Sequence, residues 1–498
     1  MRLNTHKPKN LPMSDSLGHD SRPSPLNSTL GQSSARTSAT LPIEVRFPKG
    51  FDQLIEAELN KPMMIGGERA CFGLISFFAD SRRIVLTVRE LRSIPDSDYA
   101  ITSSGTSWTS TFMARVITDA MKLDAGVLLI HSHGYSRRPS LSSVDERSFA
   151  TLLVRLRSLL PDRPHGSVVV GKGLSLGGKI ALPGSRHLHP TMVDHVRWIN
   201  SPVIDVPTIQ PDLPTHVEYY DRQTLLIGQH GQALLNNSVL GVVGLGGGGS
   251  HVVQQATHAG FGTLVLIDPD EVEPTNMSRL AGAASTDIGR SKTEVFAQVA
   301  RHIRPDVVVR TVPERFPSES GIRELRNADV VISCLDSLTA RLEVQKFSWR
   351  YLIPVVDIGI GTRLSKEENP ARVESIAGHV HVYLPGGACM WCSGLLSRDK
   401  IAAESGGKGP EYVEGAVNPA QIVSINGVVA SLALTEAMQI VTGFMVRSSE
   451  DFLRTYDAVA GQLFSIRPPF KTCPHTATEL GAGTPSSYSP SKSRTIDI

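Results

Sequence analysis

The chain has 498 residues, and at about 150 residues per domain this length corresponds to roughly three domains, or to two domains with tails. Lys and Arg number 50 against 48 Asp and Glu, so the net charge of +2 gives no field that would steer the chain to nucleic acid or to a membrane. Hydrophobic residues make up 40% and charged residues 20%, which is typical of a soluble α/β protein with a core and excludes wholesale disorder.

The two ends of the chain differ from the rest. Residues 1–41 are rich in Ser, Pro, Asn and Thr and contain no Phe, Trp or Tyr. Residues 476–498 are likewise rich in Ser, Thr and Pro, so we expect two disordered tails. The start has no apolar segment of the kind a signal peptide needs. The most apolar long stretch, 427–446, is interrupted by Glu436 and Gln439, which favours a buried helix over a membrane span.

Five cysteines are too few for a disulfide scaffold, and their odd number suits a reducing compartment. We therefore expect a cytoplasmic protein that binds neither membrane nor nucleic acid.

Between residues 42 and 190 the hydrophobic pattern predicts one α/β domain. Helices are expected at 51–59, 110–121 and 144–160, and strands at 71–78, 84–89 and 126–131. Residues 191–218 are punctuated by Pro and lack periodicity, which predicts a linker.

The second domain is expected from 219 to 475. A strand at 238–243, a Gly-rich turn, a helix at 250–259 and a strand at 263–267 form a βαβ unit of the right length for a parallel sheet. Further strands at 307–312, 330–334 and 355–358 alternate with helical patterns, so the sequence predicts a Rossmann-like doubly wound fold.

Two histidines end a strand of the first domain. His131 and His133 stand at i and i+2, a spacing that places both side chains on one face of the strand, where they could bind one ion. Farther along, Ser142 stands at a helix N-cap position and Asp145 in the first turn. Two His and one Asp leave a fourth tetrahedral position for water, as in catalytic zinc sites. The two histidines alone would equally suit ordinary polar residues at a strand exit.

This pattern over residues 43–190 resembles the JAB/MPN metalloprotease family. The resemblance implies a zinc site of His131, His133 and Asp145, with Glu68 as the acid/base that acts through zinc-bound water and Ser142 as a donor to the oxyanion. The eight residues between His133 and Ser142 are one more than the family usually has. Glu56 and Glu58 are alternatives to Glu68. If Glu68 is only a surface residue, the site binds metal without cleaving.

A glycine-rich loop follows the first strand of the second domain and opens a helix. Its backbone N–H groups can approach a phosphate at the helix N-terminus without Cβ clashes. Asp268 ends the next strand, where a carboxylate would hold ribose hydroxyls. On these features alone, NAD binding would be the default interpretation, so a nicotinamide-dependent oxidoreductase is kept as an alternative.

Downstream residues favour ATP and Mg²⁺ over NAD, because Asn, Arg and Lys suit a triphosphate and an Asp suits magnesium in adenylyl transfer. The set resembles the ubiquitin-activating and ThiF-type adenylyltransferase family over residues 215–475. The resemblance implies that glycines form the phosphate loop, that Asp268 takes the ribose, that three polar residues contact phosphates and that Asp336 binds magnesium. The loop glycines are Gly244, Gly246, Gly247 and Gly249, and the phosphate-contacting residues are Asn276, Arg279 and Lys292. Leu280 departs from the Gln that the family often has after the Arg.

Residues 220–223 resemble the N-terminal motif of that family, whose Arg reaches the triphosphate of a partner subunit. Arg222 then implies a homodimer.

Cys389 and Cys392 form a CxxC, and Cys473 with His475 could complete a structural zinc site, although the family usually has a Cys where Thr476 stands. A metal-free site is the alternative. Cys71 and Cys334 lie in apolar strands and suit buried hydrophobic positions.

Residues 393–472 contain no cysteine, so we expect adenylation without a thioester on this chain, unless Cys389 or Cys392 is free to serve. A separate conjugating enzyme or sulfur carrier would take the acyl group.

The sequence therefore predicts a bifunctional enzyme that processes a ubiquitin-like protein ending in glycine with a zinc isopeptidase and activates it with ATP. A non-catalytic scaffold with an inactive metalloprotease domain is the other alternative.

Overall fold

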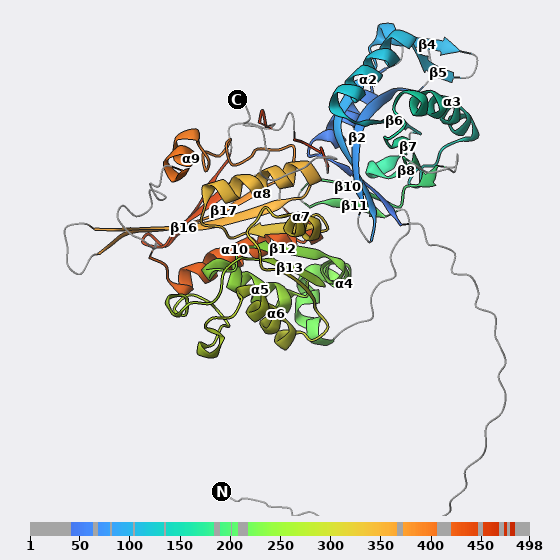
Figure 1. Cartoon of the computed structure of the whole chain (residues 1–498). Helices are drawn as coiled ribbons and strands as arrows, with labels where there is room; N and C mark the ends of the chain where they lie inside the picture. The colour runs from blue at the N-terminus through green and yellow to red at the C-terminus, as the bar shows by residue number, and fades with distance from the viewer. Residues whose placement is uncertain are drawn as a thin grey trace, which may run out of the picture. The chain divides into compact units, whose positions relative to one another are not determined.

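The computed structural model describes residues 41–62, 68–79, 82–102, 105–133, 136–183, 190–200, 202–207, 218–365, 372–405, 420–446, 452–467, 473–475 and 479–483. From Leu41 onward the chain forms one compact unit built on two large sheets (Figure 1). We call residues 41–207 the N-terminal module and residues 218–483 the C-terminal module. The expected N-terminal tail lies outside the described residues, apart from Leu41.

The N-terminal module contains a nine-stranded sheet in the order β11-β10-β1-β3-β2-β6-β7-β8-β9. Its large strands are β1 (Ile43–Phe47), β2 (Ala70–Ala79), β3 (Ile84–Ser93), β6 (Gly126–Ser132), β7 (His165–Val170) and β8 (Leu176–Ala181). A separate hairpin is formed by β4 (Tyr99–Thr102) and β5 (Gly105–Trp108). The helices are α1 (Phe51–Leu59), α2 (Ser110–Leu123) and α3 (Ser143–Leu159), so the three predicted helices are confirmed within about two residues at each end.

Alternation along β2 explains how this sheet is buried on both faces. Cys71 and Ile75 join one hydrophobic cluster, whereas Phe72 and Leu74 join the opposite cluster with Phe112 of α2. Successive side chains of a strand point to opposite faces, so an unbroken apolar run is expected where both faces are covered.

The expected linker is not irregular over its first half. The structure places β9 (Thr191–Met192), β10 (His195–Trp198) and β11 (Ile204–Pro207) in this segment, and β10 pairs in parallel with β1. The prediction of a linker over 191–207 is therefore wrong. Pro residues are tolerated in strands at sheet edges. The Pro-rich composition of this segment therefore did not exclude strands.

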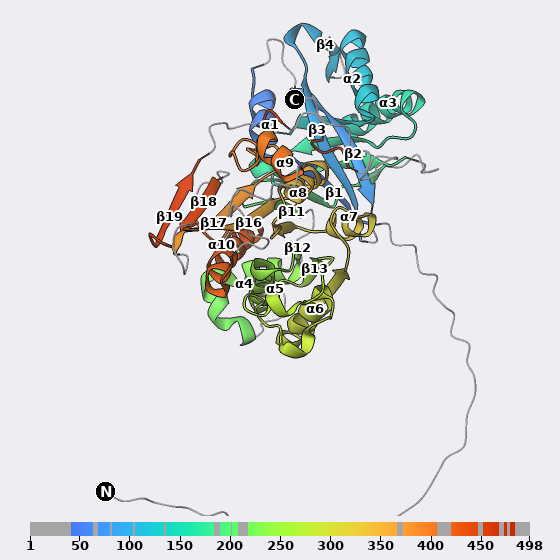
Figure 2. The ribbon, with the colours of Figure 1, turned by 60° about the vertical axis from the view of Figure 1, so that its left-hand side comes forward.

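The C-terminal module contains an eight-stranded sheet in the order β14-β13-β12-β15-β16-β17-β18-β19. Its first five strands are parallel, as expected for a doubly wound sheet: β12 (Val239–Val243), β13 (Thr263–Ile267), β14 (Val308–Val312), β15 (Val330–Ser333) and β16 (Val355–Leu364). An antiparallel extension follows with β17 (Val373–Tyr383), β18 (Phe452–Asp457) and β19 (Gln462–Ile466), which lie side by side in Figure 2.

Helices cover both faces of this sheet (Figure 1). One hydrophobic cluster joins the sheet to α4 (Asp221–Asn237), α5 (Gly247–Ala259), α6 (Lys292–Ile303) and α10 (Val423–Thr442). The opposite cluster joins it to α7 (Glu319–Leu325) and α8 (Leu338–Tyr351). The short helix α9 (Arg398–Ser405) packs against α8.

Helix α10 is long and apolar enough to cross a membrane by length and composition, and it is the one such helix among the described residues. Half of its apolar window is buried, and Val429, Ala433 and Ala437 lie in the core cluster beside α5. This packing agrees with the expected buried helix.

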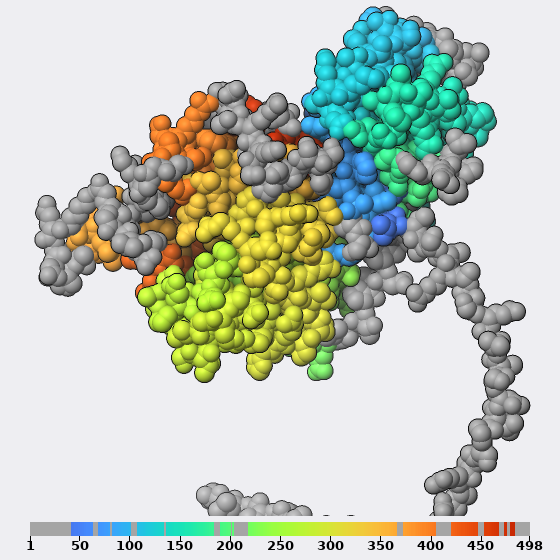
Figure 3. Space-filling model, in the orientation of Figure 1, coloured from blue at the N-terminus to red at the C-terminus, as the bar shows by residue number. Residues whose placement is uncertain are grey.

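The two modules share a hydrophobic core. Phe78 and Val85 of the N-terminal sheet belong to the same cluster as Phe347 and Tyr351 of α8, and the rings of Phe78 and Tyr351 meet edge to face at 5.1 Å. Figure 3 shows blue atoms of the N-terminal sheet beside the yellow surface around α7. The modules are therefore joined by packed side chains as well as by the chain itself.

Residues 479–483 also lie at this boundary. Gly481 N donates to Trp349 O, and Gly481 O accepts from Thr87 Oγ1 at 2.6 Å, so the segment connects α8 to β3. The prediction of disorder is wrong for these five residues. Glycines allow the close approach, because a Cβ at Gly481 would lie 3.0 Å from Val88 O.

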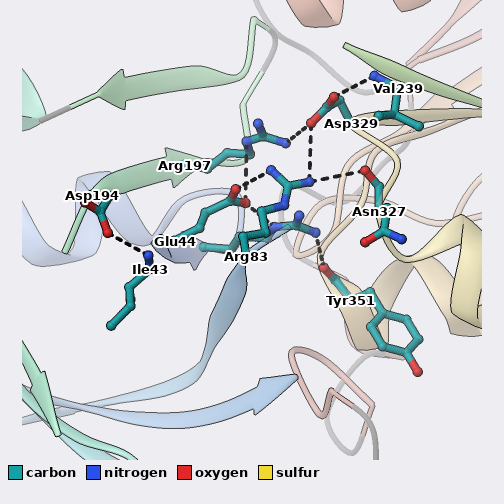
Figure 4. A network of polar contacts seen from close by, with 10 residues as sticks. Ile43, Glu44, Arg83, Asp194, Arg197, Val239, Asn327, Asp329 and Tyr351 are labelled. Atoms are coloured by element: carbon teal, nitrogen blue, oxygen red, sulfur yellow. Dashed lines mark hydrogen bonds and ion pairs between the residues drawn. The ribbon is translucent and has the colours of Figure 1, made fainter. Parts of the chain in front are cut away.

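A buried ionic network completes the boundary (Figure 4). Glu44 of β1, 2% exposed, accepts from Arg46 and Arg83 at 2.5 Å each. Arg46 and Arg83 donate onward to backbone carbonyls of the C-terminal module, and Arg197 of β10 donates to Asp329 at 2.6 Å. The arginines hold the pKa of Glu44 well below its usual value against the effect of burial. Charged side chains of the two modules thus compensate one another at the boundary, and removing one would leave its buried partner without an opposite charge.

Candidate functional site

The phosphate loop lies between β12 and α5, and its positions require glycine for different reasons. Gly244 has a φ of +90°, a backbone conformation that favours glycine. A Cβ at Gly249 would lie 2.0 Å from Gly244 O, and one at Gly247 would lie 2.3 Å from Asn426 Nδ2. At Gly246 a Cβ would meet nothing within 4 Å, so the loop is open there.

The loop opens a helix that has no side-chain cap. Gly246 occupies the N-cap position of α5, and with no side chain it makes no cap hydrogen bond to the first turn. Uncapped N–H groups and the helix dipole favour an anion at such an end. The arrangement fits a nucleotide phosphate.

Asp268 and Lys292 lie together beside this loop. Asp268 is 5% exposed, and its carboxylate accepts from Leu245 N at 2.6 Å and from Asp270 N at 2.9 Å. Lys292 Nζ lies 2.8 Å from Asp270 Oδ2 and 3.8 Å from Asp268 Oδ1. Burial raises the pKa of Asp268, while Lys292 and the two backbone donors oppose that rise. Asp268 thus fixes the loop, and Lys292 carries a positive charge to it.

Asn276 and Arg279 follow on the same stretch of chain. Asn276 is 4% exposed and caps a short turn by accepting from Glu273 N, while Arg279 donates to Thr275 O. The structure shows local contacts for both residues, and their expected contacts with phosphate stay predictions.

Asp336 reaches the same edge of the sheet by topology. β15 pairs with β12, so the loops after both strands meet at their carboxyl ends, where ligands bind in open α/β sheets. A Cβ at Gly244 would lie 2.8 Å from Cys334 O, two residues before the exposed Asp336. The structure thus brings the phosphate loop, Asp268, Lys292 and the Asp336 loop together.

Arg222 lies elsewhere in its own chain. Its neighbour Tyr220 packs against Gly260, which follows the last turn of α5. The phosphate loop lies at the other end of this 13-residue helix, about 20 Å away at 1.5 Å per residue. Arg222 is exposed, and this distance separates it from the phosphate loop of its own chain.

The second cluster of interest lies in the N-terminal module and is set by strand register. His131 of β6 pairs with Ala70 of β2 in an antiparallel ladder, and continuing this register places Glu68 opposite His133. His133 Nε2 lies 3.8 Å from Glu68 Oε2. Glu58, an alternative to Glu68, instead pairs with Lys61 and Arg69.

Asp145 reaches both histidines from the first turn of α3. Its oxygens lie 3.3 Å from His131 Nε2 and 3.2 Å from His133 Nε2. The longer loop before Ser142 therefore does not keep the carboxylate away. Burial lowers the pKa of His131, which favours the neutral imidazole that binds metals. Its ring nitrogens are buried and lack a hydrogen-bond partner among the described residues, so this donor set fits a metal ion.

Ser142 caps α3. Its Oγ accepts from Asp145 N at 3.2 Å, and Asp145 Oδ2 accepts from Ser142 N at 2.7 Å, which is a capping-box arrangement. This fixes the ligand carboxylate, whereas the donation from Ser142 to an oxyanion stays a prediction.

A third cluster is formed by Cys389, Cys392, Cys473 and His475. One ligand atom from each lies within 4.8 Å of all the others, with the three sulfurs 3.5–3.6 Å from His475 Nδ1. The hydrogen bond from Cys473 lowers the pKa of Cys389 to about 6, which favours the thiolate that binds metal. These four residues fit a closed structural zinc site, in which His475 would substitute for the Cys that the family usually has at the position of Thr476.

Sequence reasoning missed two charged residues beside the Asp336 loop. Arg341 donates to Leu335 O, and Glu404 of α9 accepts from the first turn of α8. Arg341 gave a weak signal as a charged residue in a buried helix. Glu404 gave none, because its partner lies 66 residues away in the chain.

Comparison with known proteins covers mainly the C-terminal module. The ThiF family matches residues 220–475, just over half of the chain. Over 235 residues the chain is 28% identical to the adenylyltransferase and sulfurtransferase UBA4 of Meyerozyma guilliermondii, covering 47% of this chain and 50% of that protein. Over 150 residues it is 33% identical to the sulfur carrier protein ThiS adenylyltransferase of Escherichia coli, covering 29% and 60%.

The chain thus spans about half the length of the curated relatives it matches. Among solved structures, E. coli MccB with MccA-N7isoAsn has a TM-score of 0.43 at 19% identity, covering 52% of this chain and 74% of that chain.

Proposed function

The chain belongs to the ThiF family, and from this premise we propose that its C-terminal module activates a protein carboxylate with ATP. The substrate class is a small ubiquitin-like or sulfur-carrier protein, as the names of its relatives suggest. The reacting carboxylate in this proposal is that of a C-terminal glycine. The observation that carries this proposal is the convergence of an open, uncapped phosphate loop with Lys292 and the Asp336 loop at one sheet edge.

In the proposed reaction a carboxylate oxygen attacks the α-phosphorus of ATP, forming the P–O bond of an acyl-adenylate. The bond between the α-phosphorus and the bridging oxygen breaks, and pyrophosphate leaves with the electron pair. Mg²⁺ held by Asp336 would neutralise phosphate charge. Loop N–H groups, Asn276, Arg279 and Lys292 would position the triphosphate, and Asp268 would hold the ribose.

A homodimer is part of this proposal, because Arg222 lies far from the phosphate loop of its own chain. Leu225 and Leu226 on the same helix are 89% and 70% exposed, an unusual apolar surface close to Arg222 in the sequence. A second copy that covers this surface would bring Arg222 to its partner's triphosphate.

We further propose that the acyl group leaves the chain without a thioester stage. Cys389 and Cys392 are buried with Cys473 and His475, an arrangement that suits zinc rather than acyl transfer. A separate conjugating enzyme or sulfur carrier would supply the nucleophile.

The test is ATP–pyrophosphate exchange by the purified chain with a panel of small ubiquitin-like proteins that end in glycine. We expect exchange that requires both a modifier and Asp336, so Asp336→Ala abolishes it. Asp306→Ala, which removes an 81%-exposed carboxylate elsewhere, serves as the matched control. Failure of every modifier despite Mg-ATP binding would contradict the proposal, and preference for NAD would favour the oxidoreductase alternative.

A second function is favoured by the His131, His133, Asp145 and Glu68 cluster, which supports a JAB/MPN-type zinc isopeptidase. Two His and one Asp would hold the ion, which when bound supplies an activated water and polarises the amide carbonyl. Glu68 lies beside His133, where it could take and return a proton. The module would trim the modifier precursor or release the modifier from its targets.

Cleavage of a modifier fused to a C-terminal extension tests this second function. We expect cleavage that zinc chelators stop and that His131→Ala abolishes. Cleavage that persists in the His131→Ala variant would contradict it, and absence of bound zinc would favour a scaffold role for this module.

A further inference from the structure

The loop of residues 334–337, which carries Asp336, is held from one side by a buried guanidinium. Arg341 is 7% exposed and donates to Leu335 O from Nε at 3.0 Å and from a terminal nitrogen at 2.5 Å. It also donates to Ile358 O at 3.0 Å. The residue immediately before Asp336 is thus fixed to the neighbouring strand β16.

Arg341 is itself fixed by a buried acid. Its other terminal nitrogen lies 3.5 Å from Asp357 Oδ2, and His379 Nε2 lies 2.9 Å from the same oxygen. The other oxygen of Asp357 accepts from Ser333 Oγ at 2.7 Å. Arg341, Asp357, His379 and Ser333 thus form one connected network that joins this side of the loop to the sheet.

The opposite side of the loop is held by Glu404 of α9. Its carboxylate accepts from Leu338 N at 2.8 Å, Thr339 N at 2.9 Å, Thr339 Oγ1 at 2.7 Å and Ser337 Oγ at 3.3 Å. A carboxylate at a helix N-terminus is favoured by the unpaired N–H groups and by the helix dipole. These donors hold the pKa of Glu404 below its usual value, against the effect of burial.

We propose that Glu404 is a positioning residue that completes the magnesium site by holding the first turn of α8 and thereby Asp336. This inference rests on the proposed function, since it concerns the same nucleotide site. Asp336 lies between Leu335, which Arg341 holds, and Leu338, which Glu404 holds. Releasing one side frees the backbone of the loop, so the Asp336 carboxylate must be ordered again before it binds an ion.

The dependence on α9 gives Glu404 a distinct role. Arg341 belongs to α8 itself, whereas Glu404 comes from a later segment, so the geometry of Asp336 requires α9 to be docked on α8. Groups that orient a metal ligand without touching the metal change metal affinity by about 10–100-fold when they are removed. The expected effect is therefore on magnesium rather than on the nucleotide alone.

The experiment measures ATP binding to the full chain by titration calorimetry over a series of Mg²⁺ concentrations. In Glu404→Gln we expect the Mg²⁺ concentration needed for half of the gain in ATP affinity to rise about 10–100-fold. ATP affinity without Mg²⁺ should stay the same. The matched control is Asp399→Asn, which removes an exposed carboxylate from the first turn of the same helix and should behave as the native chain.

Thr339→Ala is a second variant if Glu404→Gln folds poorly. It removes one donor to the carboxylate and should shift the Mg²⁺ dependence in the same direction by a smaller factor. An unchanged Mg²⁺ dependence in folded Glu404→Gln would overturn the inference, as would an equal loss of ATP affinity with and without Mg²⁺, which indicates general damage.

The result separates this inference from the proposed function. If the chain binds Mg-ATP but exchanges with no modifier, the proposed substrate is wrong, while the Mg²⁺ series still decides the role of Glu404. If the native chain binds no ATP, the proposed function and the inference fail together.

Discussion

The two clusters of potential metal ligands differ in the number and exposure of their side chains. Cys389, Cys392, Cys473 and His475 could offer four ligands, two of them on buried residues, which is the number that a closed tetrahedral site uses. The cluster of His131, His133 and Asp145 presents three ligands and stands next to Glu68, whose side chain is 55% exposed. A closed set of four holds a fold together, whereas an open set of three leaves room for water and a proton acceptor.

The difference extends to what stabilises each module. The closed cluster ties the segment of residues 473–475 to the loop after β17, and Trp349 of α8 packs on it. The N-terminal module has instead the buried Glu44 network and the shared core at the module boundary. We therefore expect metal removal to unfold part of the C-terminal module while leaving the N-terminal module folded and inactive.

The largest expected effect is on chemistry at the open cluster. Glu68→Gln should lower the rate of modifier cleavage by about 10²–10⁴-fold, the usual contribution of a general acid/base, and should leave zinc content unchanged. Glu56 and Glu58 are unsuitable as controls because they are the alternatives to Glu68, so Asp162→Asn, which removes an exposed carboxylate of the same module, is the matched variant. Cleavage at the native rate in Glu68→Gln would contradict an acid/base role for Glu68.

A large effect on stability is expected at the closed cluster. Cys392→Ser should lose one zinc per chain and lower the free energy of unfolding by about 4 kcal/mol at a free zinc concentration 1,000-fold above Kd. Elemental analysis and denaturant unfolding measure the two effects. Cys71→Ala, which removes a buried thiol outside the cluster, should keep the zinc. Loss of cleavage activity in folded Cys392→Ser would show that the two clusters are not independent.

The third predicted effect concerns the buried ionic network at the module boundary. Glu44→Gln should lower the free energy of unfolding by about 3–5 kcal/mol, because it leaves Arg46 buried without its charged partner. Chemical denaturation with and without chelator measures it. If ion pairs rather than zinc stabilise the N-terminal module, a chelator should not enlarge this loss of unfolding free energy. A larger loss in the presence of chelator would contradict that view.

The smallest effect is a pH dependence of the same network. The folded-state pKa of Glu44 lies well below its ordinary value of 4.5, so its contribution to stability is complete above about pH 4.5 and is lost as the pH falls further. The difference in Tm between native chain and Glu44→Gln should therefore be constant from pH 7 to about 5 and should shrink below that range. A Tm difference that stays constant down to pH 3 would show that the arginines do not stabilise the ionised carboxylate of Glu44.

Local patterns in the sequence account for much of the fold and of both sites. The spacing of His131 and His133, the N-cap at Ser142 and the glycine loop all concern neighbours in the chain, and the structure places them as expected. Asp145 also reaches the histidines despite the longer loop, since the helix N-terminus returns it to the strand end.

Contacts between distant segments could not be predicted in this way. Strand β10 pairs with β1 across about 150 residues, and nothing in its Pro-rich surroundings indicates that partner. Residues 479–483 read as a tail because their partners lie in α8 and β3. The role of Glu404 could not be predicted for the same reason, because a single carboxylate in a polar helix does not indicate which helix end it binds.

We propose that both modules act on one protein substrate in sequence. The most direct measurement is ATP–pyrophosphate exchange with a modifier whose C-terminal glycine is masked by a short peptide extension. The native chain should support exchange after a lag, whereas His131→Ala should support none with the extended modifier and full exchange with the mature one. Immediate exchange by His131→Ala on the extended modifier, or no exchange by the native chain despite complete trimming, would contradict the account.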